Sequence, residues 1–277
     1  MTPALPDPLC ALLARERLTV ARAEEVTSLG RREGTRRTFR LELSGGALAK
    51  GRTHRTPEVA QRMARWIPFV APHGYAALRG AHDTATLEEW VEGAPLDARD
   101  PDGAEQAGAL LGACHGALPC EEIAASDPRL VAWWDDCVAW IAEIRAGAHL
   151  DGAEAERVAS RLRALRPQSA RWGLYHGDFH PDNLVVDAGR VRCVDNTTVR
   201  PHLLEVDPGF AFNRWPLDGA LRERFLRGYR RHADPSRFLA DEPFWRISAA
   251  VRSAAYRVRE RSGNVELPLG ELAGLVA

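Results

Sequence analysis

The stretch of residues 175–195 constrains the fold of this chain more than any other. It opens with a polar loop, Tyr-His-Gly-Asp-Phe-His-Pro-Asp-Asn, in which acid, amide and imidazole groups are crowded together. Two apolar runs follow, Leu-Val-Val and Val-Arg-Cys-Val, and the residues between them, Asp-Ala-Gly-Arg, are typical of a tight turn. The pattern predicts a β-hairpin. Because a hairpin brings its two ends together, we expect Asn183 and Asp195 to lie close to each other and near Asp178.

These residue types suit one kind of chemistry. Carboxylate and amide oxygens are ligands that Mg²⁺ accepts, so Asn183 and Asp195 can share a cation. An aspartate such as Asp178 can take a proton. Together they are the groups needed for phosphoryl transfer from a magnesium–nucleotide complex.

The loop and hairpin also resemble a known family. The motif His-Gly-Asp-Phe-His-Pro-x-Asn, followed by a hairpin and Val-Asp, is similar to the catalytic loop and metal-binding segment of the aminoglycoside phosphotransferase family. These proteins are small-molecule kinases with a protein-kinase-like fold. The resemblance implies that Asp178 is the catalytic base, that Asn183 and Asp195 bind magnesium, and that His176 shapes the loop.

The resemblance further implies the architecture and the reaction. We expect an α+β, bilobal, protein-kinase-like fold with a small antiparallel-sheet N-lobe that binds the nucleotide, residues 1–92. A mostly helical C-lobe, residues 93–277, would carry the catalytic loop and the substrate-binding helices. The cofactors would be ATP or GTP with Mg²⁺. The acceptor would be a hydroxyl group of an aminoglycoside-like antibiotic, an amino sugar or an amino alcohol.

The composition is consistent with a globular enzyme. The chain has 277 residues and is 45% hydrophobic, which is enough for one large or two modest domains. A net charge of −1 gives no electrostatic case for nucleic-acid or membrane binding. The five cysteines form no Cys-x-x-Cys pair, and we expect them to be buried thiols. With no secretory signal visible, we expect a cytoplasmic monomer or homodimer.

Lys50 is the only lysine in the chain, so 36 of the 37 basic residues are arginine. A compact ammonium cannot be replaced by a planar guanidinium where it must fit between phosphates, so a single lysine suggests a function. It ends a predicted strand, 47–50, after predicted strands 24–29 and 37–43, with a glycine-containing loop at 30–35. This order resembles the start of a kinase N-lobe, whose third-strand lysine contacts the α- and β-phosphates. A solvated surface lysine is the alternative.

A helix is predicted from Pro57 to about Trp66, because Thr56 and Pro57 are typical of a helix start. Glu58 is the only acid in this helix and is therefore the candidate partner that fixes Lys50. The alternative is a glutamate that merely suits the helix dipole.

Two more strands, 75–78 and 84–91, are predicted before the run Glu-Gly-Ala-Pro-Leu. Their order resembles the hinge of the family. Main-chain groups near Glu89 and Val91 would then hold the adenine edge of the nucleotide. An edge strand followed by a turn explains the same pattern equally well.

Helical periodicity dominates the rest of the chain. One predicted helix carries a broad stripe of tryptophan, leucine and isoleucine, which is more typical of a core than of a stacking surface. The predicted helices span residues 7–15, 104–118, 128–146, 154–165, 217–231, 243–261 and 268–277.

The sequence departs from the family after Asp195. Asn196 stands where the family usually has phenylalanine, and Ala211 replaces the second acid of an Asp-Pro-x-x-Asp pattern. That second acid normally braces the catalytic loop, so its absence puts the bracing in doubt. For Asp207, the first acid of the pattern, we expect helix capping.

Two other classes of protein remain as alternatives. The departures at Asn196 and Ala211 suggest a pseudokinase that binds nucleotide as a regulatory module. A metal hydrolase is the second alternative, since the His-x-Asp-x-His pattern of residues 176–180, together with Asp195, could bind a transition metal.

Overall fold

The computed structural model describes residues 4–27, 36–215, 218–260 and 264–276. The chain divides into two compact units, which we describe separately. The first contains Met1–Leu96 and Asp182–Arg200, and the second contains Asp97–Pro181 and Pro201–Ala277. The predicted boundary between the two lobes, after residue 92, therefore lies close to Leu96, where the first segment of the first unit ends. The return of residues 182–200 to the first unit was not foreseen, because it depends on long-range strand pairing.

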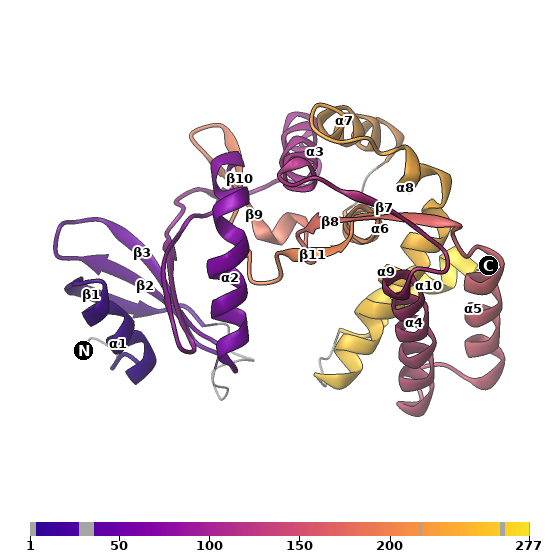
Figure 1. Ribbon diagram of the computed structural model, residues 1–277, viewed down its shortest axis with the longest axis horizontal. Coiled ribbons are helices and arrows are strands. Elements are labelled where there is room, and N and C mark those ends of the chain that lie inside the picture. Colours follow the sequence, from indigo (N-terminus) through magenta and orange to yellow (C-terminus); the bar gives the residue numbers. More distant parts are fainter. Residues whose placement is uncertain (1–3, 28–35, 216–217, 261–263, 277) are drawn as a thin grey trace. The chain divides into compact units, whose positions relative to one another are not determined.

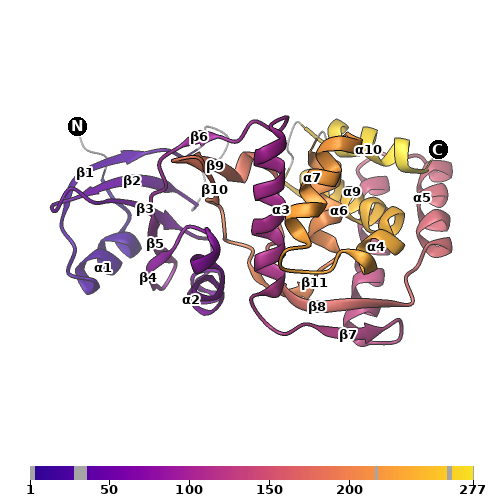
Figure 2. The same ribbon diagram turned by 90° about the horizontal axis from the view of Figure 1, so that it is seen from above.

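A five-stranded antiparallel sheet forms the centre of the first unit (Figure 1). The strand order is β1-β2-β3-β5-β4. The strands span Val20–Glu25 (β1), Thr38–Leu43 (β2), Leu48–Thr53 (β3), Leu78–His82 (β4) and Ala85–Glu89 (β5). Helix α1 (Asp7–Arg15) and helix α2 (Pro57–Val70) lie on opposite sides of strands β4 and β5 (Figures 1 and 2), and a short 3₁₀ turn, Ala71–His73, follows α2.

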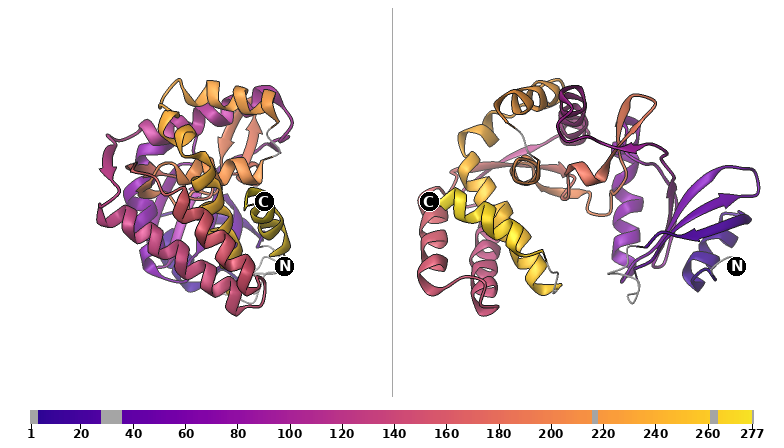
Figure 3. Two further views of the ribbon diagram at one scale, coloured as in Figure 1. Left: turned by 90° about the vertical axis from the view of Figure 1, so that its right-hand side faces the viewer. Right: turned by 180° about the vertical axis from the view of Figure 1, so that it is seen from behind.

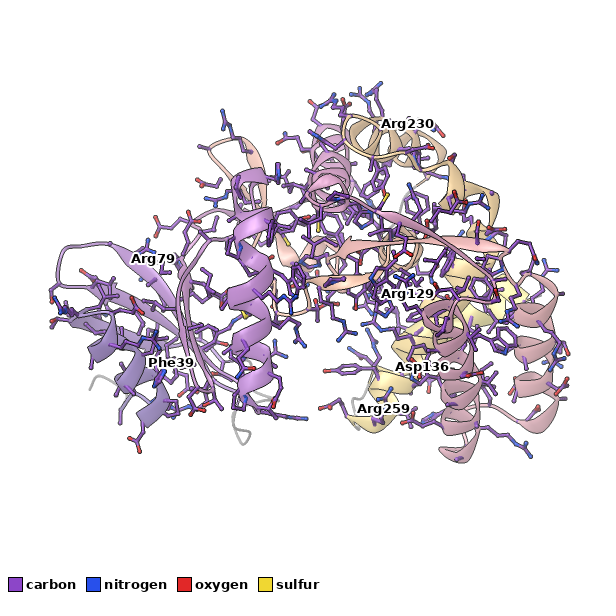
Figure 4. All side chains as sticks on the ribbon, viewed as in Figure 1. Phe39, Arg79, Arg129, Asp136, Arg230 and Arg259 are labelled. Carbon is purple, nitrogen blue, oxygen red and sulfur yellow. The ribbon has the colours of Figure 1, made fainter. Side chains whose placement is uncertain are left out.

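One face of this sheet is a hydrophobic core covered by α1. Leu9 and Leu12 of the helix pack with Phe39, Leu41 and Leu87 of the strands, and all five side chains are fully buried. Figure 4 shows Phe39 in this region, near α1. Because successive strand residues point to opposite faces, the alternate residues of β3 and β5 face the other way. That second face carries polar and charged side chains.

A second, three-stranded sheet in the same unit contains the predicted hairpin. Its order is β10-β9-β6, with β6 at Ala94–Pro95, β9 at Leu184–Asp187 and β10 at Arg190–Cys193. The turn uses left-handed backbone at Ala188 (φ 47°) and Gly189 (φ 77°), which is typical of a tight hairpin connection. A 3₁₀ turn, Pro181–Asn183, leads into β9.

The second unit is mostly helical, as predicted, with one small sheet of order β11-β8-β7. The strands span Glu121–Ala124 (β7), Ser169–Tyr175 (β8) and Arg200–Leu203 (β11). Figure 3 shows α4 and α5 packed side by side. The helices span Pro101–Gly116 (α3), Pro128–Ala146 (α4), Gly152–Ala164 (α5), Val206–Arg214 (α6), Gly219–Tyr229 (α7), Ser236–Ala240 (α8), Glu242–Arg259 (α9) and Glu266–Val276 (α10).

Most of the predicted elements agree with the structure, and the differences have physical causes. The first strand begins at Val20 rather than residue 24, because Val20 and Ala23 pack on the α1 core. Tyr75 is not in β4 but forms an isolated parallel bridge with Cys193. The glycine-containing loop at 30–35 lies outside the described residues.

The cysteines are all free thiols, but the prediction that they are buried was wrong for two of the five. Cys10 and Cys120 are exposed, while Cys114, Cys137 and Cys193 are buried. The exposure of Cys10 and Cys120 could not be predicted from the spacing of the cysteines alone.

Glycines allow helices α3 and α7 to pack at backbone contact distance (Figure 2). A Cβ atom at Gly108 would collide with the carbonyl oxygen of Phe225, and one at Gly228 would collide with that of Glu105. Because backbone atoms are the obstacles, no side-chain rotation can relieve these collisions.

We expect Gly108→Ala to lower the free energy of unfolding by about 1–3 kcal/mol, the usual cost of overpacking. The loss should appear even though alanine is the better helix former by about 1 kcal/mol. Denaturant unfolding measures it, with Gly219→Ala as the control, since a Cβ atom at Gly219 meets nothing within 4 Å. Equal stability of the two variants would contradict the close contact.

Candidate active site

Two cationic side chains of β3 lie on the polar face of the first unit's large sheet. Lys50 and Arg52 lie two residues apart on β3 and therefore share one face. Glu88 is paired with Lys50 across β3 and β5 and belongs to the same face. Arg52 is 5% exposed and Glu88 is 1% exposed. The sequence pointed to Lys50 but not to Arg52 or Glu88, which only the strand register and burial distinguish.

The hairpin brings Asn183 and Asp195 to the same end, as predicted. The amide of Val194 donates to the carbonyl oxygen of Asn183 at 3.0 Å, so the residues that flank the hairpin are directly linked. Both Asn183 and the Asp195 side chain are partly exposed. Two oxygen-bearing side chains thus lie at one end of one hairpin.

Main-chain and side-chain bonds fix the hairpin to β5 and to the segment before β4. The amide of Ala76 donates to the carbonyl oxygen of Cys193 at 2.9 Å, and the buried Asn196 donates to the carbonyl oxygen of Ala76 at 3.2 Å. The Arg192 guanidinium binds both carboxylate oxygens of Glu89 at 2.9 and 2.7 Å. Asn196, a departure from the family pattern, is therefore an anchor of this segment.

Lys50 and Arg52 both reach the end of the hairpin. The Lys50 ammonium donates to the carbonyl oxygen of Val194 at 2.5 Å. Nη1 of Arg52 lies 2.8 Å from Oδ1 of Asp195. Burial opposes ionisation of Asp195, but the charges of Arg52 and Lys50 outweigh it and lower the pKa of this carboxyl below its usual range. Burial lowers the pKa of Lys50, and the neighbouring Arg52 charge adds to this effect.

The predicted partnership between Glu58 and Lys50 was wrong. Glu58 is exposed in the first turn of α2, and a hydrogen bond with the Thr56 side chain lowers its pKa. The acid whose charge acts on Lys50 from across the sheet is Glu88. The position of Glu58 therefore agrees with the alternative interpretation, in which an acid in the first turn interacts favourably with the helix dipole.

The predicted hinge residues lie at the end of β5 and just beyond it. The amide of Glu89 donates to the carbonyl oxygen of Ala77 at 2.7 Å, and its carboxylate is held by Arg192. Val91 follows the strand and is partly buried. Adenine recognition by the main chain near these residues stays a prediction.

In the second unit, strand β8 leads directly into the loop that carries Asp178. The amide of Asp178 donates to Nδ1 of the buried His176 at 3.3 Å, and Gly177 between them has a left-handed φ of 83°. Nε2 of His180 lies 3.4 Å from Oδ1 of Asp178. The Asp178 side chain is 42% exposed, so a hydroxyl group can approach it.

The loop is braced by Asp207, which corrects the expectation that this residue is mainly a helix cap. The carboxylate of Asp207 is fully buried and accepts from the amides of His176 and Gly177 at 2.6 and 2.7 Å. Nε2 of His115 lies 3.0 Å away, and His115 in turn contacts the Tyr229 hydroxyl at 2.6 Å. The bracing that Ala211 seemed to remove is therefore supplied one turn earlier.

The pKa of Asp207 follows from these contacts. Burial alone would raise it, but the hydrogen bond and charge of His115 and the amide of His176 outweigh burial and lower the pKa. The carboxylate is therefore ionised at neutral pH, which suits an acceptor of several hydrogen bonds.

The donor set of the first unit fits magnesium. Asn183 and Asp195 supply an amide oxygen and a carboxylate oxygen, which are hard ligands at the hairpin end. Among the described residues, no group of three or more His, Cys, Asp or Glu side chains could hold a metal ion. Asp178 belongs to the second unit.

His54 follows the last residue of β3, at the end of the polar face. Its burial can be tested through the pH dependence of stability. It is 4% exposed with Nε2 2.9 Å from the Thr86 hydroxyl. Burial, with the charges of Arg52 and Arg36, lowers the pKa of His54 to about 3. In an unfolded chain the pKa is about 6.5, so the unfolded state binds a proton first as the pH falls. Acid below about pH 6.5 therefore destabilises the folded protein.

We expect this residue to account for a loss of about 2 kcal/mol in the free energy of unfolding between pH 7 and pH 5. In His54→Gln the loss over that range should shrink by this amount, as measured by denaturant unfolding at both pH values. His73→Gln, at an exposed position, should behave as the wild type does. Identical pH dependence in the wild type and His54→Gln would show that His54 titrates normally.

Comparisons with known proteins identify the family of this chain. The model of the phosphotransferase enzyme family matches residues 30–240, and the chain belongs to this family. The predicted family is thus confirmed. No curated protein sequence matches the chain.

Several solved structures share the fold over nearly the whole chain. A macrolide 2′-phosphotransferase type I is 18% identical, with 100% of this chain and 99% of the other covered at a TM-score of 0.67. A macrolide 2′-phosphotransferase from Brachybacterium faecium is 19% identical, with 98% of both chains covered and a TM-score of 0.61. An amicoumacin kinase in complex with AMP-PNP and Ca²⁺ is 13% identical, with 98% and 92% covered and a TM-score of 0.63. The bilobal kinase-like fold is therefore confirmed.

None of the helices in the described part of the chain is both long enough and apolar enough to cross a membrane.

Proposed function

We propose that this protein transfers the γ-phosphoryl group of a nucleoside triphosphate to a hydroxyl group of a small molecule. The observation that carries the proposal is the convergence of Lys50, Asn183 and Asp195 at one end of the hairpin in the first unit. A cation for phosphate beside two oxygen ligands for magnesium is what a metal–triphosphate complex requires. Membership of the phosphotransferase enzyme family supports the same reaction.

Each residue has a role that its chemistry allows. Lys50 steadies the α- and β-phosphates, and Asn183 and Asp195 hold Mg²⁺, which when bound offsets negative charge on the phosphate oxygens. Asp178 accepts a proton or a hydrogen bond from the acceptor hydroxyl and aligns it for attack on the γ-phosphorus. Its partial exposure is consistent with this role. Positioning and electrostatics supply most of the acceleration.

The acceptor is an aminoglycoside-like antibiotic, an amino sugar or an amino alcohol. Solved structures of the same fold include kinases named for macrolides and for amicoumacin, which supports a polyfunctional, hydroxyl-bearing acceptor. One fold hosts several acceptors, so a screen must identify this one. ATP and GTP are both candidate donors.

The contacts described above favour a kinase over a pseudokinase. The alternative arose from Asn196 and Ala211. Asn196 anchors the hairpin segment through Ala76, and Asp207 braces the loop in place of an acid at residue 211. Both departures thus leave the segments that carry the proposed machinery held by buried contacts.

The reaction can be tested by ³¹P NMR with ATP or GTP, Mg²⁺ and a panel of aminoglycosides, macrolides, amino sugars and amino alcohols. A phosphomonoester resonance should appear with at least one acceptor, and only when the divalent cation is present. Nucleotide binding without transfer to any acceptor class would support the pseudokinase instead.

A further inference from the structure

Arg52 is a buried arginine whose guanidinium lies between two carboxylates. Nη1 is 2.8 Å from Oδ1 of Asp195, and Nε is 3.7 Å from Oε1 of Glu88. Its side chain is only 7% exposed, against 23% for Asp195 and 1% for Glu88. Burying a guanidinium is costly unless acids compensate it, and here two acids do so.

The two acids differ in what surrounds them. Glu88 lies within the sheet, where it also accepts from the Thr86 hydroxyl at 3.4 Å. Asp195 is partly exposed at the end of the hairpin, and its Oδ1 also accepts from the Thr197 hydroxyl at 3.1 Å. Oδ2 of Asp195 lies 3.7 Å from Arg36. Glu88 is thus the partner of Arg52 that is enclosed in the sheet, while Asp195 is the partner at the hairpin end, where the metal is proposed to bind.

We propose that Arg52 is a built-in cation that occupies the Asp195 carboxylate until a metal ion binds there, so that Arg52 and the metal compete for one acid. The inference rests on the proposed function, in which Asp195 is a metal ligand. A carboxylate that is already neutralised by a guanidinium attracts a second cation less strongly, because like charges repel at short range. The pair with Glu88 keeps Arg52 compensated when Asp195 leaves it.

The consequence is a preference for the metal–nucleotide complex over the free metal. A free divalent cation adds only positive charge to a site that already holds Lys50, Arg52 and Arg36 around Asp195. A triphosphate adds negative charge, which Lys50 and Arg52 attract, and this offsets the repulsion. Free metal should therefore bind weakly, and metal that arrives with nucleotide should bind well.

The competition can be measured by electron paramagnetic resonance of Mn²⁺ binding without nucleotide. The test variant is the double substitution Arg52→Gln with Glu88→Gln, which removes both buried charges and leaves no unpaired acid in the sheet. Its Mn²⁺ dissociation constant should be at least ten-fold lower than that of the wild type. Adding Asp195→Asn to the double variant should abolish the gain, because the freed carboxylate is then absent.

A matched control is the double substitution Arg37→Gln with Glu25→Gln. This ion pair, with Nη2 of Arg37 2.6 Å from Oε2 of Glu25, joins the end of β1 to the residue before β2 at the edge of the same sheet. Its removal should leave the Mn²⁺ affinity unchanged. If the test variant does not fold, Arg52→Lys serves instead: it keeps a charge opposite Glu88 but is too short to reach both acids, and it should tighten Mn²⁺ binding at least three-fold.

An unchanged or weaker Mn²⁺ affinity in the folded Arg52 variants would overturn the competition. A different result would contradict the proposed function itself. If Mn²⁺ with AMP-PNP binds the wild type and Asp195→Asn removes that binding, but the Arg52 variants show no gain, only the role of Arg52 is wrong. If Mn²⁺ with AMP-PNP binds no better to the wild type than to Asp195→Asn, the metal assignment fails and the competition fails with it.

Discussion

Asp178→Asn is expected to lower kcat by a factor of about 10²–10⁴, the usual contribution of a positioned acid–base group. Asparagine keeps the size of the side chain but cannot accept the proton of the acceptor hydroxyl. The loop should keep its shape, because the amide of Asp178, not its carboxylate, donates to His176, and Asp207 holds the preceding amides. Steady-state kinetics with the acceptor found by the NMR screen measures the effect.

The matched control is Asp182→Asn, which changes an exposed acid of the same loop at the variable position of the motif. Its kcat should stay within a few-fold of the wild type. Nucleotide binding by Asp178→Asn should also be preserved, as thermal-shift titration can show. A kcat for Asp178→Asn close to that of the wild type would remove Asp178 from the mechanism.

Asp207→Ala is expected to lower the free energy of unfolding by about 3–5 kcal/mol, the cost of breaking a buried charged network from one side. The substitution leaves the amides of His176 and Gly177 and the ring of His115 without their acceptor in a fully buried site. Activity should fall as well, since these amides fix the loop next to Asp178. Denaturant unfolding at pH 7 measures the stability.

The control is Asp218→Ala, which removes an aspartate that caps α7 by accepting from the amide of Leu221. A lost N-cap should cost only about 1 kcal/mol. If Asp207→Ala costs no more than this, the buried carboxylate does not brace the loop.

The lowered pKa of Asp207 also fixes the sign of a pH effect. Its ordinary value is about 3.9, and the folded value is lower. The stabilisation is therefore fully present above about pH 4 and is lost as the pH falls through the folded pKa.

Local signals in the sequence predicted the parts of the fold that local interactions decide. The hairpin at 184–193 followed from a turn sequence between two apolar runs, and α4 begins at Pro128 because Asp127 caps it. The sheet that joins β7, β8 and β11 was missed. Strands β7 and β8 are separated by helices α4 and α5, and β8 and β11 by the hairpin, so the three strands pair only because the chain returns from far away.

In the candidate site, too, the features set by local sequence were predicted and those set by long-range pairing were not. Motif spacing predicted that the ends of the hairpin would meet, and the carbonyl of Asn183 accepts from the amide of Val194. Glu58 was the predicted partner of Lys50 because it is the only acid in its helix. One residue does not show which face of the helix packs against the sheet. Arg52 could not be singled out among 36 arginines, since only the strand register and burial distinguish it.

The central claim is that the first unit binds a metal–triphosphate complex through Lys50 and Asp195. Calorimetric titration of ATP and of GTP, each with Mg²⁺, into the wild type, Lys50→Met and Asp195→Asn tests it most directly. We predict that at least one nucleotide binds the wild type stoichiometrically, and that each substitution weakens this binding at least ten-fold. Binding of neither nucleotide, or equal binding by all three proteins, would contradict it.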